Sequence, residues 1–158
     1  MSDIRALVVT VSNRAAAGVY DDRAGPVAVA ALAELGATVD GPVVVADGAP
    51  VEQALREAVE AAYDVVVTAG GTGISPTDRT PEMTRRVIDR EVPGIADAVR
   101  MAGRDQVPTS ILSRGVAGLA GRTLVVNLPG SPGGVRDGIA VLGQVLVHAV
   151  DQVRGGDH

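Results

Sequence analysis

The chain has 158 residues, of which 46 % are hydrophobic and 21 % charged, and its formal net charge is −5 at pH 7. It contains no Cys and no Lys, which excludes thiolate and cysteine–zinc chemistry, Schiff bases and a P-loop lysine. The negative charge and the two aromatic residues disfavour nucleic-acid binding, and no apolar run is long enough to span a membrane. We therefore expect a cytoplasmic protein with a single domain over residues 1–154 and a flexible tail over residues 155–158.

Strand-like and helix-like segments alternate along the chain. In the first half, we expect strands over residues 4–11, 42–46 and 64–68, a loop over 13–25, and helices over 26–35 and 51–62. In the second half, we expect a helix starting at residue 80, a helix over 93–104, an antiparallel edge from strands 110–117 and 122–128, and a last helix over 131–153. This alternation predicts a three-layer α/β fold, in which a mostly parallel sheet has helices on both faces.

The segment from Thr68 to Glu82 has the densest set of ligand-type residues. It follows a buried strand and precedes a helix, so it lies at the carboxyl edge of the sheet, where open α/β folds bind ligands. Glycines let backbone N–H groups approach phosphate oxygens, and hydroxyls add further donors. A carboxylate repels phosphate, so Asp78 indicates a bridging Mg²⁺ rather than a mere helix cap. The candidate phosphate-binding residues are Gly70, Gly71, Thr72, Gly73, Ser75 and Thr77.

Three other strand ends reach the same edge of the sheet. Gly130 and Ser131 follow a strand and precede a helix, so they could form a second wall of the pocket, although Ser131 is also an ordinary N-cap. Ser12 ends the first strand and could line the pocket. For Asp47, the spacing alone favours a helix cap, and residues 21–23 are expected to form a solvated loop.

With both glycine-bearing loops identified, the sequence resembles the MogA/MoaB family of molybdenum-cofactor biosynthesis proteins. The similarity spans nearly the whole chain and is closer to the MogA-type branch. It is carried by residues 11–12, 17–18, 22–26, 45–47, 68–82, 112–114, 117–118, 121 and 127–132, among which the GGTG-xSPxDxTPE and NLPGSP motifs are the most specific.

The resemblance implies a molybdopterin adenylyltransferase that transfers AMP from Mg-ATP to the terminal phosphate of molybdopterin and releases pyrophosphate. Two aspartates implicated in the family's activity match Asp47 and Asp78, which would organise Mg²⁺ and the triphosphate. Gly130 and Ser131 would then help to seat the pterin or its phosphate. The family also implies a homotrimer, or a hexamer in the MoaB branch, and docking to a separate molybdenum-insertion enzyme.

Two other functions are compatible with parts of the sequence. One is a non-catalytic, MoaB-like molybdopterin carrier or scaffold, which would bind the pterin without consuming ATP. The other is a dinucleotide oxidoreductase, which is disfavoured because no G-x-G-x-x-G follows the first strand. The chain also departs from many relatives, which have Asp in place of Asn13, Ser in place of Ala16 and Ala24, and an acidic residue in place of Gly48. The departures at Asn13, Ala16 and Ala24 leave the ligand contacts between residues 12 and 25 open.

Overall fold

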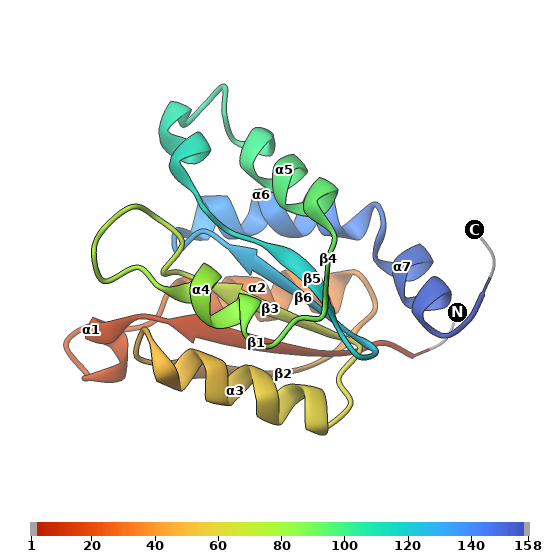
Figure 1. The fold of residues 1–158 in the computed structure, drawn as a ribbon. Coiled ribbons are helices and arrows are strands. Elements are labelled where there is room, and N and C mark those ends of the chain that lie inside the picture. The colour runs from red at the N-terminus through yellow and green to blue at the C-terminus, as the bar shows by residue number, and fades with distance from the viewer. Residues whose placement is uncertain (1–2, 157–158) are drawn as a thin grey trace.

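A six-stranded sheet with the strand order β2-β1-β3-β6-β5-β4 forms the centre of the structure (Figure 1). The computed structural model describes residues 3–156, so residues 157–158 of the expected tail lie outside the described part. β2, β1, β3 and β6 are parallel, whereas β5 and β4 are antiparallel to their neighbours. The strands are β1 (Arg5–Val11), β2 (Thr38–Val45), β3 (Val65–Ala69), β4 (Arg90–Glu91), β5 (Ala117–Ala120) and β6 (Thr123–Leu128).

Helices cover both faces of this sheet, which confirms the predicted three-layer architecture (Figure 1). One layer contains α3 (Ala49–Glu60) and α4 (Thr80–Arg85), and the other contains α2 (Ala24–Glu34), α5 (Pro93–Ala102) and α6 (Pro132–Gly143). Shorter elements are α1 (Asn13–Ala16), the 3₁₀ helix η1 (Pro108–Leu112) and α7 (Leu146–Val153). None of the helices within residues 3–156 has both the length and the apolar character needed to cross a membrane.

Alternating residues of the central strands divide the core between the two helical layers. In β3, Val66 packs in the α3 and α4 layer, whereas Val65 and Val67 pack in the layer of α2, α5 and α6. All five residues of β3 are buried, as expected for a parallel strand covered on both faces. This rigid centre holds the carboxyl ends of β1, β3 and β6 side by side.

The prediction of a strand over residues 110–117 is wrong. Residues 108–112 form η1, where Ile111 and Leu112 remain 53 % and 47 % exposed, and the strand begins only at Ala117. Pro108 favours the start of this helical turn because its φ is preset and its missing N–H is not needed there. Ile111 and Leu112 therefore lie outside the core, whereas Val116 and Ala117 of the same segment are buried. The two-residue strand β4 was not predicted, because both of its residues are exposed and carry no apolar pattern.

Three predicted boundaries also differ from the structure. The last helix breaks after Gly143 into α6 and α7, and α2 begins at Ala24 rather than at Pro26. The second strand extends from Thr38 to Val45, so it starts before Pro42. Proline is tolerated there because β2 is an edge strand, and the pairing register with β1 shifts at this point. The loop expected over residues 13–25 contains α1 and the first residues of α2.

Candidate functional site

The loops that follow β1, β2, β3 and β6 meet at one edge of the sheet. We call residues 70–78, which follow β3, the glycine loop. Its first residue, Gly70, donates its N–H to the Leu128 carbonyl at 3.1 Å. A Cβ atom on Gly130 would lie 3.3 Å from the Cα of Gly70, so glycine at this position allows the two backbones to pack closely. On the other side, the backbone N–H of Asp47 donates to Asn13 Oδ1 at 2.9 Å.

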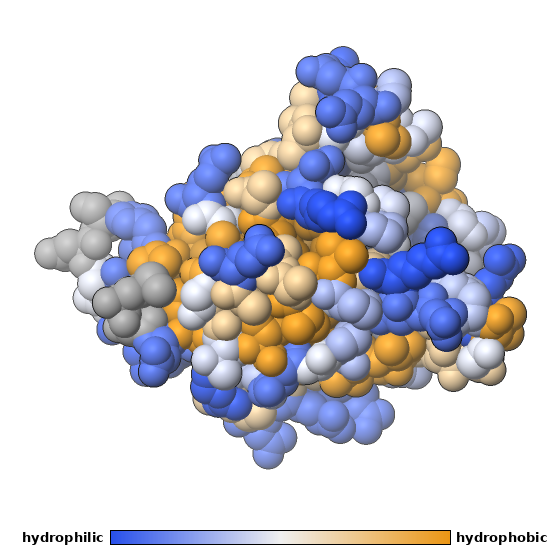
Figure 2. Space-filling model, turned by 180° about the vertical axis from the view of Figure 1, so that it is seen from behind, coloured by the Kyte–Doolittle hydropathy of each residue, from blue (hydrophilic) through white to orange (hydrophobic). Residues whose placement is uncertain are grey.

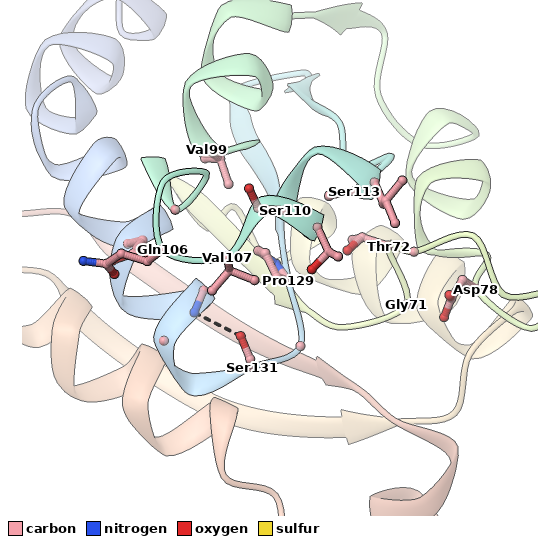
Figure 3. Close-up of a pocket in the computed structure, with 18 residues that line it drawn as sticks. Gly71, Thr72, Asp78, Val99, Gln106, Val107, Ser110, Ser113, Pro129 and Ser131 are labelled. Atoms are coloured by element: carbon pink, nitrogen blue, oxygen red, sulfur yellow. Dashed lines mark hydrogen bonds between the residues drawn. The ribbon is translucent and has the colours of Figure 1, made fainter. Parts of the chain in front are cut away.

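A cavity of about 490 Å³ opens beside the glycine loop. Its walls come from the glycine loop, from the segment between α5 and β5, and from the start of α6. Figure 3 shows Asp78 at one end of the labelled residues and Gln106 at the other. The predicted site residues that line this cavity are Gly71, Thr72, Gly73, Asp78, Gly130 and Ser131.

Unpaired backbone donors make the glycine loop suited to anions. Within residues 3–156, the N–H groups of Gly71, Thr72 and Gly73 donate no hydrogen bond to the protein. Thr80 holds the loop in place, because its side-chain hydroxyl donates to the Gly70 carbonyl at 3.0 Å and its backbone N–H donates to the Gly71 carbonyl at 3.1 Å. The loop therefore presents N–H groups beside the cavity in the way that phosphate-binding loops do.

Asp47 is not a helix cap, contrary to the interpretation that spacing alone favoured. The N-cap of α3 is Gly48, which makes no side-chain capping bond. Asp47 Oδ1 instead accepts the N–H groups of Gly48 and Arg79 at 2.7 and 3.1 Å. Asp47 Oδ2 accepts no hydrogen bond from the described residues, and it contacts the position that a Cβ of Gly71 would occupy. One oxygen thus fixes the carboxylate while the other faces the glycine loop.

Asp78 has a matching arrangement. Its Oδ2 accepts the Ser75 N–H at 3.0 Å, while its own N–H donates to the Ser75 carbonyl at 3.0 Å. Within the described part of the chain, Oδ1 accepts no hydrogen bond. A Cβ on Gly73 would lie 2.8 Å from Oδ2, so glycine leaves room for this side chain. Asp78 therefore also has one anchored oxygen and one oxygen available to a ligand.

The surroundings of Asp47, including the charge of Asp78, alter its pKa. Burial raises the pKa of Asp47 above its usual value; hydrogen bonds from Gly48 and Arg79 oppose this, and the charge of Asp78 adds to it. A raised pKa means that the folded protein holds the proton more tightly than the unfolded chain does. The unfolding free energy contributed by Asp47 is therefore greatest at acidic pH and declines as the pH rises through the folded pKa.

Asp47→Asn is accordingly expected to raise the melting temperature at pH 7 and to remove this part of the pH dependence of stability. Its amide oxygen still accepts the Gly48 and Arg79 N–H groups, while the cost of a partly buried charge is lost. Thermal unfolding of the wild type and the variant between pH 4 and 8 checks this. A lower melting temperature for Asp47→Asn at pH 7 would contradict it.

Five predicted site residues are not among those that line this cavity: Ser12, Asp47, Gly70, Ser75 and Thr77. Ser75 and Thr77 are exposed on the outer part of the glycine loop, where their hydroxyl oxygens lie 3.3 Å apart. Ser12 lines a neighbouring cavity of about 420 Å³, together with Gly70, Gly71 and Gly130. Ser12 Oγ accepts the Ala15 N–H at 3.2 Å and lies 2.9 Å from the Tyr20 hydroxyl oxygen.

The expectation of a solvated loop over residues 21–23 is wrong for Asp22, whereas Asp21 and Arg23 are exposed as expected. The Asp22 side chain is half-buried, accepts the Thr10 hydroxyl at 2.7 Å and the Gly25 N–H at 2.9 Å, and lines the neighbouring cavity. It thereby joins β1 to the start of α2. The sequence did contain a signal for this contact: Asp22 lies three positions before Gly25, and Asp is a favoured acceptor for backbone N–H groups at the start of a helix.

Arg114 and Asn127 are close to the site but were given no individual role by the sequence reasoning. Arg114 donates to the glycine loop and to Glu82. Asn127 is 2 % exposed, accepts the Val116 N–H and donates to the hydroxyls of Thr68 and Thr84. The wall formed by residues 103–113 was also missed, because an incorrect strand was expected there.

The carboxylates of Asp47 and Asp78 are the groups at the glycine loop that could bind a metal ion. Among residues 3–156, no group of three or more His, Cys, Asp or Glu side chains is arranged to hold a metal ion. A hard cation such as Mg²⁺ binds in proteins through one or two carboxylates, waters and substrate phosphates. The free oxygens of Asp47 and Asp78 fit that mode, whereas the residues do not form a metal site made of protein ligands alone.

Comparison with known proteins gives consistent matches. Residues 7–148 match the family described as "Probable molybdopterin binding domain". The chain is 36 % identical to the molybdopterin adenylyltransferase of Helicobacter pylori strain J99, and the match covers 98 % of this chain and 90 % of that protein. It is also 36 % identical to the molybdenum cofactor biosynthesis bifunctional protein of Synechococcus elongatus, of which it spans half the length.

The fold is shared with solved structures from the same group. The structure of the molybdopterin biosynthesis Mog protein from Mycobacterium ulcerans superimposes with a TM-score of 0.91 at 56 % identity. The match covers 95 % of this chain and 99 % of that chain. The family match over residues 7–148 spans the glycine loop, both aspartates and the start of α6.

Proposed function

Because this chain belongs to the molybdopterin-binding domain family of molybdenum cofactor biosynthesis proteins, we propose that it is a molybdopterin adenylyltransferase. One observation carries this proposal: among the described residues, Asp47 and Asp78 each keep one carboxylate oxygen without a hydrogen bond, and three N–H groups of the glycine loop donate none. This arrangement fits the handling of two phosphate-bearing reactants. The substrates would be ATP and molybdopterin.

In the proposed reaction, an oxygen of the terminal phosphate of molybdopterin attacks the α-phosphorus of ATP. The bond between the α-phosphorus and the oxygen bridging to the β-phosphate breaks, and pyrophosphate leaves with that electron pair. No proton abstraction is needed, so the absence of a catalytic His or Lys is no obstacle. The task of the protein is to align the two anionic groups and to compensate their charge.

The residues of the chain divide this task. The N–H groups of Gly71, Thr72 and Gly73 would bind phosphate oxygens, and the Asp47 and Asp78 carboxylates would hold Mg²⁺. Bound Mg²⁺ supplies positive charge that offsets the phosphates. Gly130, Ser131 and Ser12 would contact the substrates from the neighbouring loops, and Ser75 and Thr77 could reach them only from the outer side of the glycine loop.

The assay that tests this proposal mixes the protein with ATP and freshly prepared molybdopterin, with Mg²⁺ present or chelated. Chromatography of the product is expected to show adenylylated molybdopterin only when Mg²⁺ is present. Pterin binding without adenylylated product would instead support the second candidate, a molybdopterin carrier. Neither binding nor product formation would contradict both functions.

We also propose that the protein assembles as a homotrimer. α2 is apolar around its circumference, with Pro26, Ala30 and Ala33 exposed and Glu34 as its one charged residue. Figure 2 shows apolar residues gathered across the face of the molecule that lies behind the sheet in Figure 1. An apolar surface of this kind is typical of an interface between copies of the same chain.

Docking to a molybdenum-insertion enzyme is a further proposal, supported by the bifunctional relative that is twice as long as this chain.

Light scattering during gel filtration tests the oligomeric state. The wild type is expected to elute with three times the mass of one chain, and Ala30→Glu is expected to lower that mass because a buried charge disrupts an apolar interface. Glu60→Ala, on the exposed end of α3, is the matched control and should leave the mass unchanged. A monomeric mass for the wild type would contradict the proposal.

A further inference from the structure

Arg114 lies behind the glycine loop and holds both ends of its outer part. Its backbone N–H donates to the Thr72 carbonyl at 2.7 Å. Its side chain donates from Nε to the Gly73 carbonyl at 2.8 Å and from Nη2 to the Asp78 carbonyl at 2.8 Å. A single residue thus ties down the backbone immediately before and at the end of the exposed stretch 74–77.

Glu82 fixes the orientation of this guanidinium. Arg114 Nη1 donates to Glu82 Oε2 at 2.6 Å, and Nη2 also reaches Oε1 at 3.3 Å, which gives a two-point contact. The hydrogen bond to Glu82 is the main cause that raises the pKa of Arg114, and the charges of Asp78 and Asp47 raise it further. The guanidinium is therefore a permanent positive charge next to the two aspartates.

The outer part of the glycine loop has few other attachments. Thr80 holds the loop at Gly70 and Gly71, but not beyond. Ile74 is 68 % exposed, and the hydrogen bonds that residues 74–77 make with the described residues are within the loop itself. Apart from the hydrogen bond of the adjacent Arg79 N–H to Asp47 Oδ1, Arg114 is therefore the main anchor of the Asp78 backbone among the described residues. Since Arg114 does not line the cavity beside Asp78, it would act on substrates only through the loop.

We propose that Arg114, oriented by Glu82, is a positioning residue that sets the Asp78 carboxylate and the glycine-loop N–H groups for adenylyl transfer. This inference rests on the proposed function. Lysine would keep the charge but could not reproduce the fork-shaped contacts to two carbonyls and a carboxylate. Arg114→Lys therefore separates the contribution of the hydrogen-bond geometry of Arg114 from that of its positive charge.

The test compares Arg114→Lys and Glu82→Gln with Arg100→Lys. Arg100 is a matched control because it is half-buried like Arg114, donates to the Gly115 carbonyl at 2.7 Å and pairs with Asp97, but does not contact the glycine loop. We expect Arg114→Lys to lower kcat for AMP transfer about 10- to 100-fold with less than about a threefold change in the KM for ATP. The Mg²⁺ concentration for half-maximal rate should rise. Glu82→Gln should show a smaller loss of kcat, and Arg100→Lys should match the wild type.

Hydrogen–deuterium exchange on the same proteins gives a readout independent of activity. Amides of residues 73–78 are expected to exchange faster in Arg114→Lys than in the wild type or in Arg100→Lys. If Arg114→Lys equals Arg100→Lys in kcat and in exchange, the inference is overturned while the proposed function stands. If the wild type makes no adenylylated product, the proposed function fails, and with it the role of Arg114 in transfer. The exchange data then decide only whether Arg114 orders the loop.

Discussion

Asp78→Asn is expected to reduce the rate of AMP transfer by at least about 100-fold, because removal of the carboxylate that we propose to hold the cation would cost several kcal/mol of transition-state stabilisation. The substitution keeps the shape of the side chain. The asparagine oxygen can still accept the Ser75 N–H that now binds Asp78 Oδ2, so the glycine loop should keep its conformation. The rate of product formation at saturating ATP and molybdopterin measures the effect.

The control for this variant is its stability and its affinity for molybdopterin. Both should remain close to those of the wild type, because Asp78 is half-buried and its loop contacts are preserved. A variant that retains more than a tenth of the wild-type rate would show that Asp78 does not serve the reaction. A variant that is inactive only because it is unfolded would be recognised by its melting temperature.

Asn127→Leu is expected to lower the free energy of unfolding by about 2–4 kcal/mol, the largest effect on stability that we predict. Asn127 Oδ1 accepts the Val116 N–H at 3.1 Å, and Nδ2 donates to Thr68 Oγ1 and Thr84 Oγ1, each at 3.0 Å. Leucine would leave the buried Val116 N–H without that acceptor. Urea unfolding monitored by circular dichroism measures the change.

Gln53→Leu is the matched control for this variant. The Gln53 amide is exposed on α3 and donates to Glu57 Oε1 at 3.2 Å. Water replaces that hydrogen bond when it is lost, so the change in unfolding free energy should stay within about 0.5 kcal/mol. Equal effects of Gln53→Leu and Asn127→Leu would contradict the assignment of Asn127 as the buried link between β6, β3 and α4.

The parts of the fold and site that depend on local pattern could be predicted from the sequence. β3 is a short apolar run that ends in glycines, so both its burial and the glycine loop after it follow from residues 64–73. Parallel strands then bring the loops after β1, β3 and β6 to one edge. The meeting of Gly70 with Gly130 is a consequence of this topology.

The parts that depend on distant contacts could not be predicted. Arg114 lies 41 residues from Gly73, and no local pattern shows that its side chain turns towards the glycine loop. Asp47 appeared to be a helix cap, because its actual partner, the Arg79 N–H, is 32 residues away. The cavity wall at residues 103–113 was missed because exposed Ile111 and Leu112 resemble strand residues in sequence.

The most direct test of the account uses ATP labelled at either the α- or the γ-phosphate, with molybdopterin and Mg²⁺. The account predicts that label from the α-phosphate appears in the pterin product and that label from the γ-phosphate appears in pyrophosphate. It also predicts that the transfer of α-label is lost in Asp78→Asn. Transfer of the γ-label to the pterin, or molybdopterin binding with no transfer of either label, would contradict the assignment of adenylyl transfer to this site.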